Sequence, residues 1–444
     1  MSSYMGKNAE IYAKATTMMP GGGSRGGAMH RVFGYPFYMD HANGSKMYSV
    51  DGTEYIDYYC CAGAAMFGHN NPNIRRGLER AMSNGFFMNF DSPATLEFAS
   101  LFTKLIPTVE EIRLTNSGTE ATLAAIRAAR AFTGRDIVVK MDFHFHGMHE
   151  MVWYFPGTDG FDEYGEARSV VAGSAGFPDS LKSLVKIIRF NDINAVEHVV
   201  EKYKGQIAAI IMEPVSYGCG CVPGKPEYMK QVRDICTQEG IMLIYDEVIS
   251  GLRFMPGSAQ SYYHVQPDLS TFAKAIGGGL SVALVGGKRE VMDMFNPVGP
   301  VVVSGTSTGN QIAVCGAVEC LKMASAPGFF EEIERKAAKL YSGMNDIMAK
   351  DGIKGHVRGM GAQFGIFFGI ENPEDDYYMA EKVMPYYDAD INDRFIAECM
   401  KRGLYMHSLG KANHPNHCGF SSVHTDTDIE NSLQIMDDAF KALK

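Results

Sequence analysis

The sequence has no long apolar run and no excess of basic residues. No stretch approaches the roughly 20 apolar residues that span a bilayer, and the beginning, MSSYMGKNAEIYAK, lacks the apolar segment of a secretory signal. Lysine and arginine together number 41 against 51 aspartates and glutamates, which gives a formal net charge of -10. Because nucleic acids and anionic membranes are bound by basic surfaces, we expect neither as a partner. These absences predict a cytoplasmic protein.

Paired cysteine motifs are also absent. The cysteine count is 9, an odd number, and no CxxC frame occurs, which favours reduced thiols in a reducing compartment. Cys219-Gly-Cys221 and the adjacent Cys60-Cys61 could serve as soft-metal ligands, but neither has a second pair or a histidine at zinc spacing. We therefore expect no metal site.

The middle of the chain alternates between helical and strand-like segments. From about residue 72 onward, apolar residues at three-and-four spacing alternate with short β-branched runs, which is typical of βα units in a mostly parallel sheet. The clearest strand candidates are 137–140, 207–212 and 241–245, and the clearest helix candidates are 74–82, 96–105 and 120–132. The sequence therefore predicts an α/β fold.

The two ends of the chain do not follow this alternation of helical and strand-like segments. A Gly-rich segment, 20–27, leads into strand-like residues 38–56, and the amphipathic helical pattern of 329–350 precedes strand-like residues 356–370. These ends could pack together as one smaller α+β domain. We predict residues 1–69 as its N-terminal part, 70–325 as a large ligand-binding domain and 326–444 as the C-terminal part of the small domain.

Two charged side chains follow predicted buried strands. Asp246 comes at the end of 241–245, and Lys274 follows the short apolar stretch 269–273, about one βα unit further along. Ligands of open parallel sheets bind in the crevice beyond the carboxyl ends of the strands. There Lys274 could pair with a phosphate or act as an amine nucleophile with a pKa lowered by burial. Asp246 alone could equally be a helix cap or a salt-bridge partner.

A third pattern predicts a binding site for phosphate. Asn116-Ser117-Gly118-Thr119 joins a short strand to a strongly helical run, so the amides of Gly118 and Thr119 would lie at a helix N-terminus, which favours anions. The nucleotide motif GxxxxGK[ST] is missing, and a plain Ser/Thr helix cap is the alternative. A phosphate site, a carboxylate and an amine on one sheet edge suit pyridoxal 5'-phosphate, which has a phosphate, a basic ring nitrogen and an aldehyde.

Nine ordered motifs resemble the class-III aminotransferases, in the branch that contains glutamate-1-semialdehyde 2,1-aminomutase and related amino-acid aminotransferases. They are YSVDGTEYIDYY, FGHNNP, RLTNSGTEATLAAIRAARAFTGR, HFHG, IIMEPV, LIYDEVISGLR, PDLSTFAKAIGGGL, SGTSTGN and SVHTDTDIE. The resemblance covers nearly the whole chain. It implies the fold of the fold-type-I pyridoxal-phosphate-dependent transferases, with the cofactor in the large domain.

The resemblance also implies residue roles. Lys274 would form the Schiff base with the cofactor, and Asp246 would contact the pyridine nitrogen. The remaining cofactor contacts implied are Gly118 and Thr119 at the phosphate, Phe145 and Val248 on the two ring faces, and Thr306 at the phosphate of the neighbouring subunit. The last contact implies a homodimer with shared active sites. His146 and Glu213 match positions near the cofactor, although hydrogen bonds that only stabilise the fold are an equal alternative.

The substrate is less determined than the cofactor. Arg25, in a Gly-rich segment like one that binds a carboxylate in relatives acting on amino acids, is our candidate carboxylate clamp; a surface arginine is the alternative. Ala62 stands where aminomutases often carry tryptophan, and the loop-like segment 157–180 does not resemble the mutase gate. We expect an enzyme that moves an amino group between an amino acid and a 2-oxo acid by a ping-pong mechanism. An intramolecular 2,1-aminomutase and an amino-acid racemase or epimerase are the alternatives.

The C-terminal segment bears on how many carboxylates the substrate carries. Residues 403–444 contain no arginine, so a second carboxylate would need Lys411, His414 or His417. We therefore expect a monocarboxylate substrate.

Overall fold

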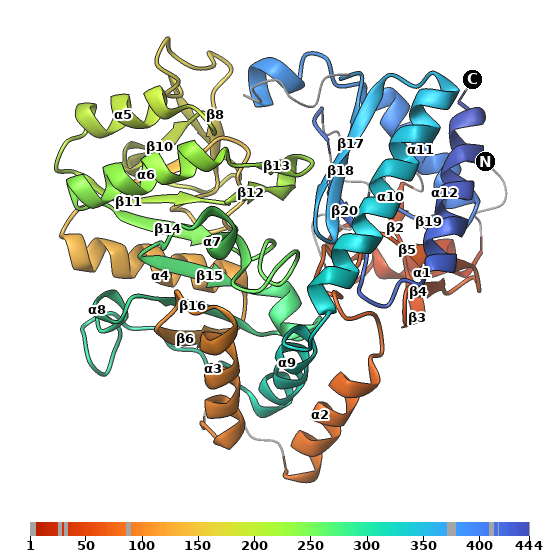
Figure 1. Ribbon diagram of the computed structural model, residues 1–444, viewed down its shortest axis with the longest axis horizontal. Coiled ribbons are helices and arrows are strands. Elements are labelled where there is room, and N and C mark those ends of the chain that lie inside the picture. Colours follow the sequence, from red (N-terminus) through yellow and green to blue (C-terminus); the bar gives the residue numbers. More distant parts are fainter. Residues whose placement is uncertain are drawn as a thin grey trace.

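The computed structural model describes residues 6–24, 29–30, 34–85, 90–370, 379–407, 413–415 and 417–443. Figure 1 shows a larger part built around a central sheet and, beside it, a part in which both ends of the chain meet.

The larger part is organised on a seven-stranded sheet. In sheet order its strands are β10 (Val185–Ile188), β7 (Ile137–Met141), β11 (Ile207–Met212), β14 (Met242–Asp246), β15 (Leu269–Phe272), β16 (Ala283–Gly287) and β6 (Glu111–Thr115). Neighbours from β10 to β15 are parallel, whereas β16 runs antiparallel to both of its neighbours. The mostly parallel sheet predicted from the sequence is confirmed.

Both faces of this sheet are covered by helices. Alternate residues of β11 point to opposite sides: Ile210 packs in a cluster with α5 (Ile193–Lys202) and α6 (Pro226–Glu239), and Ile211 packs with α4 (Gly118–Thr133). Because side chains alternate across a strand, a strand covered on both faces is a continuous apolar run. This is why the run IAAIIM predicts β11 with the bounds that the structure has.

Further helices complete the larger part. They are α2 (Pro72–Ser83), α3 (Pro93–Leu105), α7 (Ser258–Tyr263), α8 (Arg289–Met292) and α9 (Gln311–Ala324), with α2 and α3 packed on α9. The segment 157–180 differs from the predicted irregular loop. It contains β9 (Val170–Ala172), which pairs antiparallel with β8 (Tyr154–Pro156), the strand that directly precedes the segment. Strands of three residues are too short for a periodic pattern to reveal.

The two chain ends share secondary structure. Strand β19 (Leu404–Tyr405) from the C-terminal part pairs in parallel with β5 (Glu54–Asp57) from the N-terminal part. The other elements here are α1 (Lys7–Ala15), β1 (Met29–His30), β2 (Tyr35–Pro36), β3 (Met39–Asn43), β4 (Lys46–Ser49), α10 (Phe329–Asp351), β17 (Gly355–Met360), β18 (Gln363–Phe368), α11 (Ala389–Lys401), β20 (His417–Gly419) and α12 (Asp426–Lys441). The domain limits at residues 69 and 325 stay a prediction.

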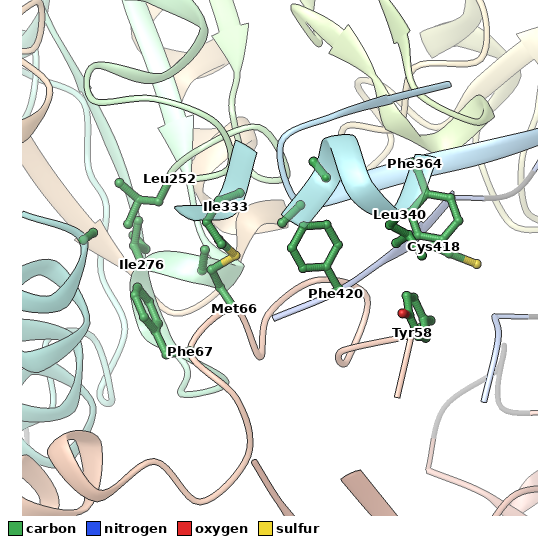
Figure 2. Packing of buried hydrophobic residues seen from close by; sticks show 14 of the residues in the cluster. Tyr58, Met66, Phe67, Leu252, Ile276, Ile333, Leu340, Phe364, Cys418 and Phe420 are labelled. Atoms are coloured by element: carbon green, nitrogen blue, oxygen red, sulfur yellow. The ribbon is translucent and has the colours of Figure 1, made fainter. Parts of the chain in front are cut away.

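One apolar cluster connects the parts. In Figure 2, Tyr58 and Met66 from the N-terminal part lie with Phe364 and Phe420 from the C-terminal part, and Ile276 of the larger part packs in the same cluster. Such shared burial favours a fixed relation between the parts, because separating them would expose apolar surface to water.

Among the described helices, none by itself combines the length and apolarity needed to cross a membrane. Helices α9 and α10 reach that combination only when taken together, and they are bent by 75° at their junction.

Candidate active site

A cavity of about 180 Å³ lies where several strands of the central sheet end. Asp246 is the last residue of β14, Glu213 directly follows β11, and Lys274 follows β15 by one further residue. These three strands are parallel neighbours, so their carboxyl ends meet at one edge. The cavity is lined by Gly118, Thr119, Phe145, His146, Gly147, Glu213, Asp246, Val248, Ile249, Ala273 and Lys274.

The structure therefore brings together eight of the ten residues that the sequence singles out. Thr306 is exposed and does not line this cavity. Arg25 lies outside the described residues, and so does Lys411.

Asp246 is held by three hydrogen-bond donors. Its Oδ2 lies 2.8 Å from Nδ1 of His146, and its Oδ1 accepts from the Thr271 hydroxyl at 3.0 Å and from the Val248 amide at 3.1 Å. An ionised carboxylate only accepts hydrogen bonds, so this set of donors suits the anion. The side chain is nearly inaccessible to solvent. Its attraction for a cationic ring nitrogen beside it would therefore be stronger than in water, because the local dielectric constant is lower.

His146 is a neutral partner of this carboxylate. Burial lowers the pKa of its imidazole, and the nearby Asp246 only partly opposes the effect. A neutral ring that donates from Nδ1 to Asp246 has its tautomer fixed by that hydrogen bond. His146 is thus both a stabilising residue and a neighbour of the site, the two alternatives that the sequence left open.

Lys274 is a half-buried residue that lines the cavity. Burial lowers the pKa of its side chain to about 8, although the nearby Glu213 and Asp246 act in the opposite direction. Among the described residues, none forms a hydrogen bond or ion pair with its amine. An amine with a pKa near neutrality is partly uncharged and therefore nucleophilic, which favours the nucleophile over the phosphate-pairing alternative.

The N-terminus of α4 approaches the cavity closely. A Cβ on Gly118 would lie 2.9 and 3.1 Å from the two γ-methyl groups of Val248. Gly147 has φ of +97°, and a Cβ there would lie 2.7 Å from the Thr119 hydroxyl. Glycine at both points avoids these close contacts, and Gly118, Thr119 and Gly147 all line the cavity. Since α4 begins here, its positive end favours the phosphate of a cofactor.

Two apolar side chains border the same space. Phe145 keeps 50% of its surface exposed although it lies on the cavity wall, and Val248 lies against Gly118. An uncovered aromatic face in a cavity suits stacking against a flat ring. A phosphate-binding helix end, a carboxylate, an amine and this ring match the groups of pyridoxal 5'-phosphate one by one.

Sequence reasoning missed Thr271 and Gly147. Thr271 reaches Asp246 because the two residues are register partners on β14 and β15, and register between parallel strands is not visible in a single sequence. Gly147 stands in the HFHG motif, where its glycine was the available signal.

One group of potential metal ligands exists in the described part of the chain. Ligand atoms of Asp162, Glu166 and His198 lie within 4.8 Å of one another. Both oxygens of Glu166 are already engaged, by Lys202 at 2.6 Å and by the Tyr203 hydroxyl at 2.9 Å. The expectation that the protein has no metal site stays a prediction.

Comparisons with known proteins agree with this geometry. The sequence model of the aminotransferase class-III family matches residues 29–440. A glutamate-1-semialdehyde 2,1-aminomutase from Desulfatibacillum aliphaticivorans is 35% identical over 440 residues, which cover 99% of this chain and 100% of that protein.

Solved structures show the same fold. The crystal structure of an omega-transaminase from Sphaerobacter thermophilus has a TM-score of 0.89 at 28% identity and covers 99% of this chain and 98% of its own. A beta-phenylalanine aminotransferase from Variovorax paradoxus has a TM-score of 0.82 at 25% identity, covering 98% and 94%. Fold and site define a pyridoxal-phosphate-dependent enzyme of fold type I. Within that class, the chain belongs to the class-III aminotransferase family.

Proposed function

We propose that the enzyme transfers an amino group between a monocarboxylate amino acid and a 2-oxo acid in a ping-pong cycle. The observation that carries the proposal is the position of Lys274 in one cavity with Asp246 and the N-terminus of α4. Transfer between two molecules is supported by the similarity to the omega-transaminase and by Ala62, a small side chain where aminomutases often carry a large ring.

Pyridoxal phosphate supplies the electron sink for this chemistry. Gly118 and Thr119 would hold its phosphate, Phe145 and Val248 would border its ring, and Asp246 would keep the ring nitrogen protonated. Lys274 would bond the cofactor until an amine substrate replaces it, and its freed Nζ would then take a proton from the substrate carbon. The neutral His146 would fix Asp246 during these steps.

The main alternative is an intramolecular 2,1-aminomutase, favoured by the 35% identity with such an enzyme. A racemase or epimerase is the other alternative. Incubation of the purified enzyme with a series of α-, β- and ω-amino acids and with pyruvate or 2-oxoglutarate separates them. We expect nitrogen to pass to the oxo acid; isomerisation of glutamate 1-semialdehyde or racemisation without any transfer would reject our choice.

For Arg25, we propose the role of substrate carboxylate clamp. Arg25→Ala should raise KM for the amino acid by about 10- to 100-fold, because hydrogen bonds to charged groups contribute about 1.5–3 kcal/mol. Cofactor absorbance should stay unchanged. Steady-state kinetics with Arg168→Ala as the control, a solvent-facing arginine of another loop, test the role; an unchanged KM would make Arg25 an ordinary surface residue.

We also propose a homodimer in which Thr306 reaches the phosphate in the partner's site. A second hollow, of about 520 Å³, is lined by residues on both sides of Thr306, including Gly305 and Thr308, and by the exposed Leu96. Two large apolar side chains of this hollow, Phe90 and Leu96, are exposed, and exposed apolar side chains suit a protein partner. Sedimentation should give twice the chain mass, and Thr306→Ala should weaken cofactor binding; a monomer with full cofactor affinity would contradict the proposal.

For its location we propose the cytoplasm. None of the 9 cysteines, all of which lie in the described ranges, forms a disulfide, which suits a reducing compartment.

A further inference from the structure

Two carboxyl groups lie side by side in the cavity, and their surroundings differ. Asp246 and Glu213 follow adjacent parallel strands, β14 and β11, whose register pairs Met212 with Tyr245. Asp246 accepts three hydrogen bonds. Glu213 accepts one of normal geometry, from the Phe145 amide to Oε1 at 2.7 Å, and its Oε2 is buried without a partner among the described residues.

The groups around Glu213 come from several elements. Asp246, at the end of β14, disfavours a negative charge on Glu213. Lys274, just after β15, favours that charge. Lys140 on β7 and Cys219 in the 217–219 turn also face the carboxyl.

Burial and Asp246 outweigh the opposing groups. Together they raise the pKa of Glu213 to about 8, although the amides of Phe145 and Tyr217 and the Lys274 amine act to lower it. A carboxyl group in such a setting stays protonated at neutral pH and can donate a hydrogen bond.

We propose that Glu213 is a neutral carboxylic acid that donates a hydrogen bond from Oε2 to the cofactor, which leaves Asp246 as the single anion of the cavity. Asp246 accepts three hydrogen bonds, which suits an ionised carboxylate, whereas Glu213 has an oxygen without a donor, which suits a protonated carboxyl. A neutral Glu213 also does not hold the Lys274 amine in its charged form. Through Oε1, the same side chain also fixes the backbone of Phe145, a neighbour in the cavity wall. The proposal rests on the cofactor site described above.

Three variants distinguish a hydrogen-bond donor at position 213 from a negative charge there. Glu213→Ala removes the donor and should weaken cofactor binding by about tenfold, the effect of a single hydrogen bond of about 1.4 kcal/mol. Glu213→Gln restores a donor without a titratable proton and should recover more than half of that loss on a logarithmic scale. Glu247→Gln is the matched control: Glu247 is equally buried, but it bonds to Ser250 and the Ala259 amide and does not line the cavity.

The pH dependence gives a second readout. The protonated form of Glu213 is present below a pH of about 8 and is lost as the pH rises through that value, so cofactor affinity should fall there in the wild type relative to Glu213→Gln. Lys274 titrates in the same range, so the comparison with Glu213→Gln, which keeps Lys274 and lacks the titratable carboxyl, is needed to assign the fall to Glu213. The control variant should follow the wild type.

Infrared difference spectroscopy of the holoenzyme reports the protonation directly. We expect a carbonyl band of a protonated carboxyl at neutral pH that disappears in Glu213→Gln. Absence of that band, or a Gln variant that binds the cofactor as weakly as the Ala variant, would overturn the proposal. A wild-type chain that binds no pyridoxal phosphate would instead reject the cofactor site on which it rests.

Discussion

Replacing Lys274 with alanine should abolish turnover and remove the visible absorbance of lysine-bound pyridoxal phosphate. Lys274 has two proposed roles, bonding the cofactor and moving a proton. Loss of the acid–base role alone lowers the rate by about 10²- to 10⁴-fold. Within the described part of the chain, Lys274 is the only lysine that lines the cavity. Absorbance spectra and single-turnover kinetics measure both losses.

Lys140 provides a matched control for this variant. It is a buried lysine with a pKa also lowered to about 8, but it donates to the Tyr154 carbonyl at 3.2 Å and does not line the cavity. Lys140→Met should keep the absorbance, since an apolar side chain of similar length replaces it. If Lys274→Ala kept normal turnover, or Lys140→Met lost the absorbance, the assignment of the two lysines would be wrong.

Replacing Asp246 with asparagine should lower kcat by about 10²- to 10⁴-fold, the range typical of a group that controls a proton in the transition state. The amide has nearly the shape of the carboxylate, so the Thr271 and Val248 donors can still bond to its oxygen. What it lacks is the negative charge that keeps a ring nitrogen protonated. We therefore expect the cofactor to remain bound while the rate falls.

A second buried aspartate separates the loss of charge from a general loss of stability. Asp268 pairs with Arg233 at 2.7 Å and with Lys288 at 2.6 Å, away from the cavity. Asp268→Asn should lower the melting temperature and leave kcat near its normal value. Kinetics and thermal unfolding of both variants provide the comparison; equal effects on kcat would count against a role of Asp246 at the cofactor.

Strands buried on both faces were the most predictable part of the fold. The run at 207–212 gives β11 with its observed bounds, and Asp246 and Lys274 could be placed at one edge because parallel strands end together. The antiparallel β16 was not predicted, since a short apolar run does not reveal its direction. The pair β8 and β9 was missed because each strand has only three residues.

The residues of the site also differ in how far the sequence predicts them. Gly118 and Thr119 could be found because a motif with a local physical role contains them, and Phe145 because the HFHG motif resembles the family. The hydrogen bond between His146 and Asp246 joins residues far apart in the chain, and no spacing rule predicts it. The unpaired Oε2 of Glu213 depends on where every neighbouring donor lies, which only the folded structure determines.

Among the lysines of the chain, we expect Lys274 to carry the cofactor. Borohydride reduction of the holoenzyme turns the bond between a lysine and pyridoxal phosphate into a stable one, and peptide mass spectrometry then locates the modified residue. We expect one phosphopyridoxyl group per chain, on the peptide that contains Lys274. Modification of another lysine, or none, would contradict this assignment.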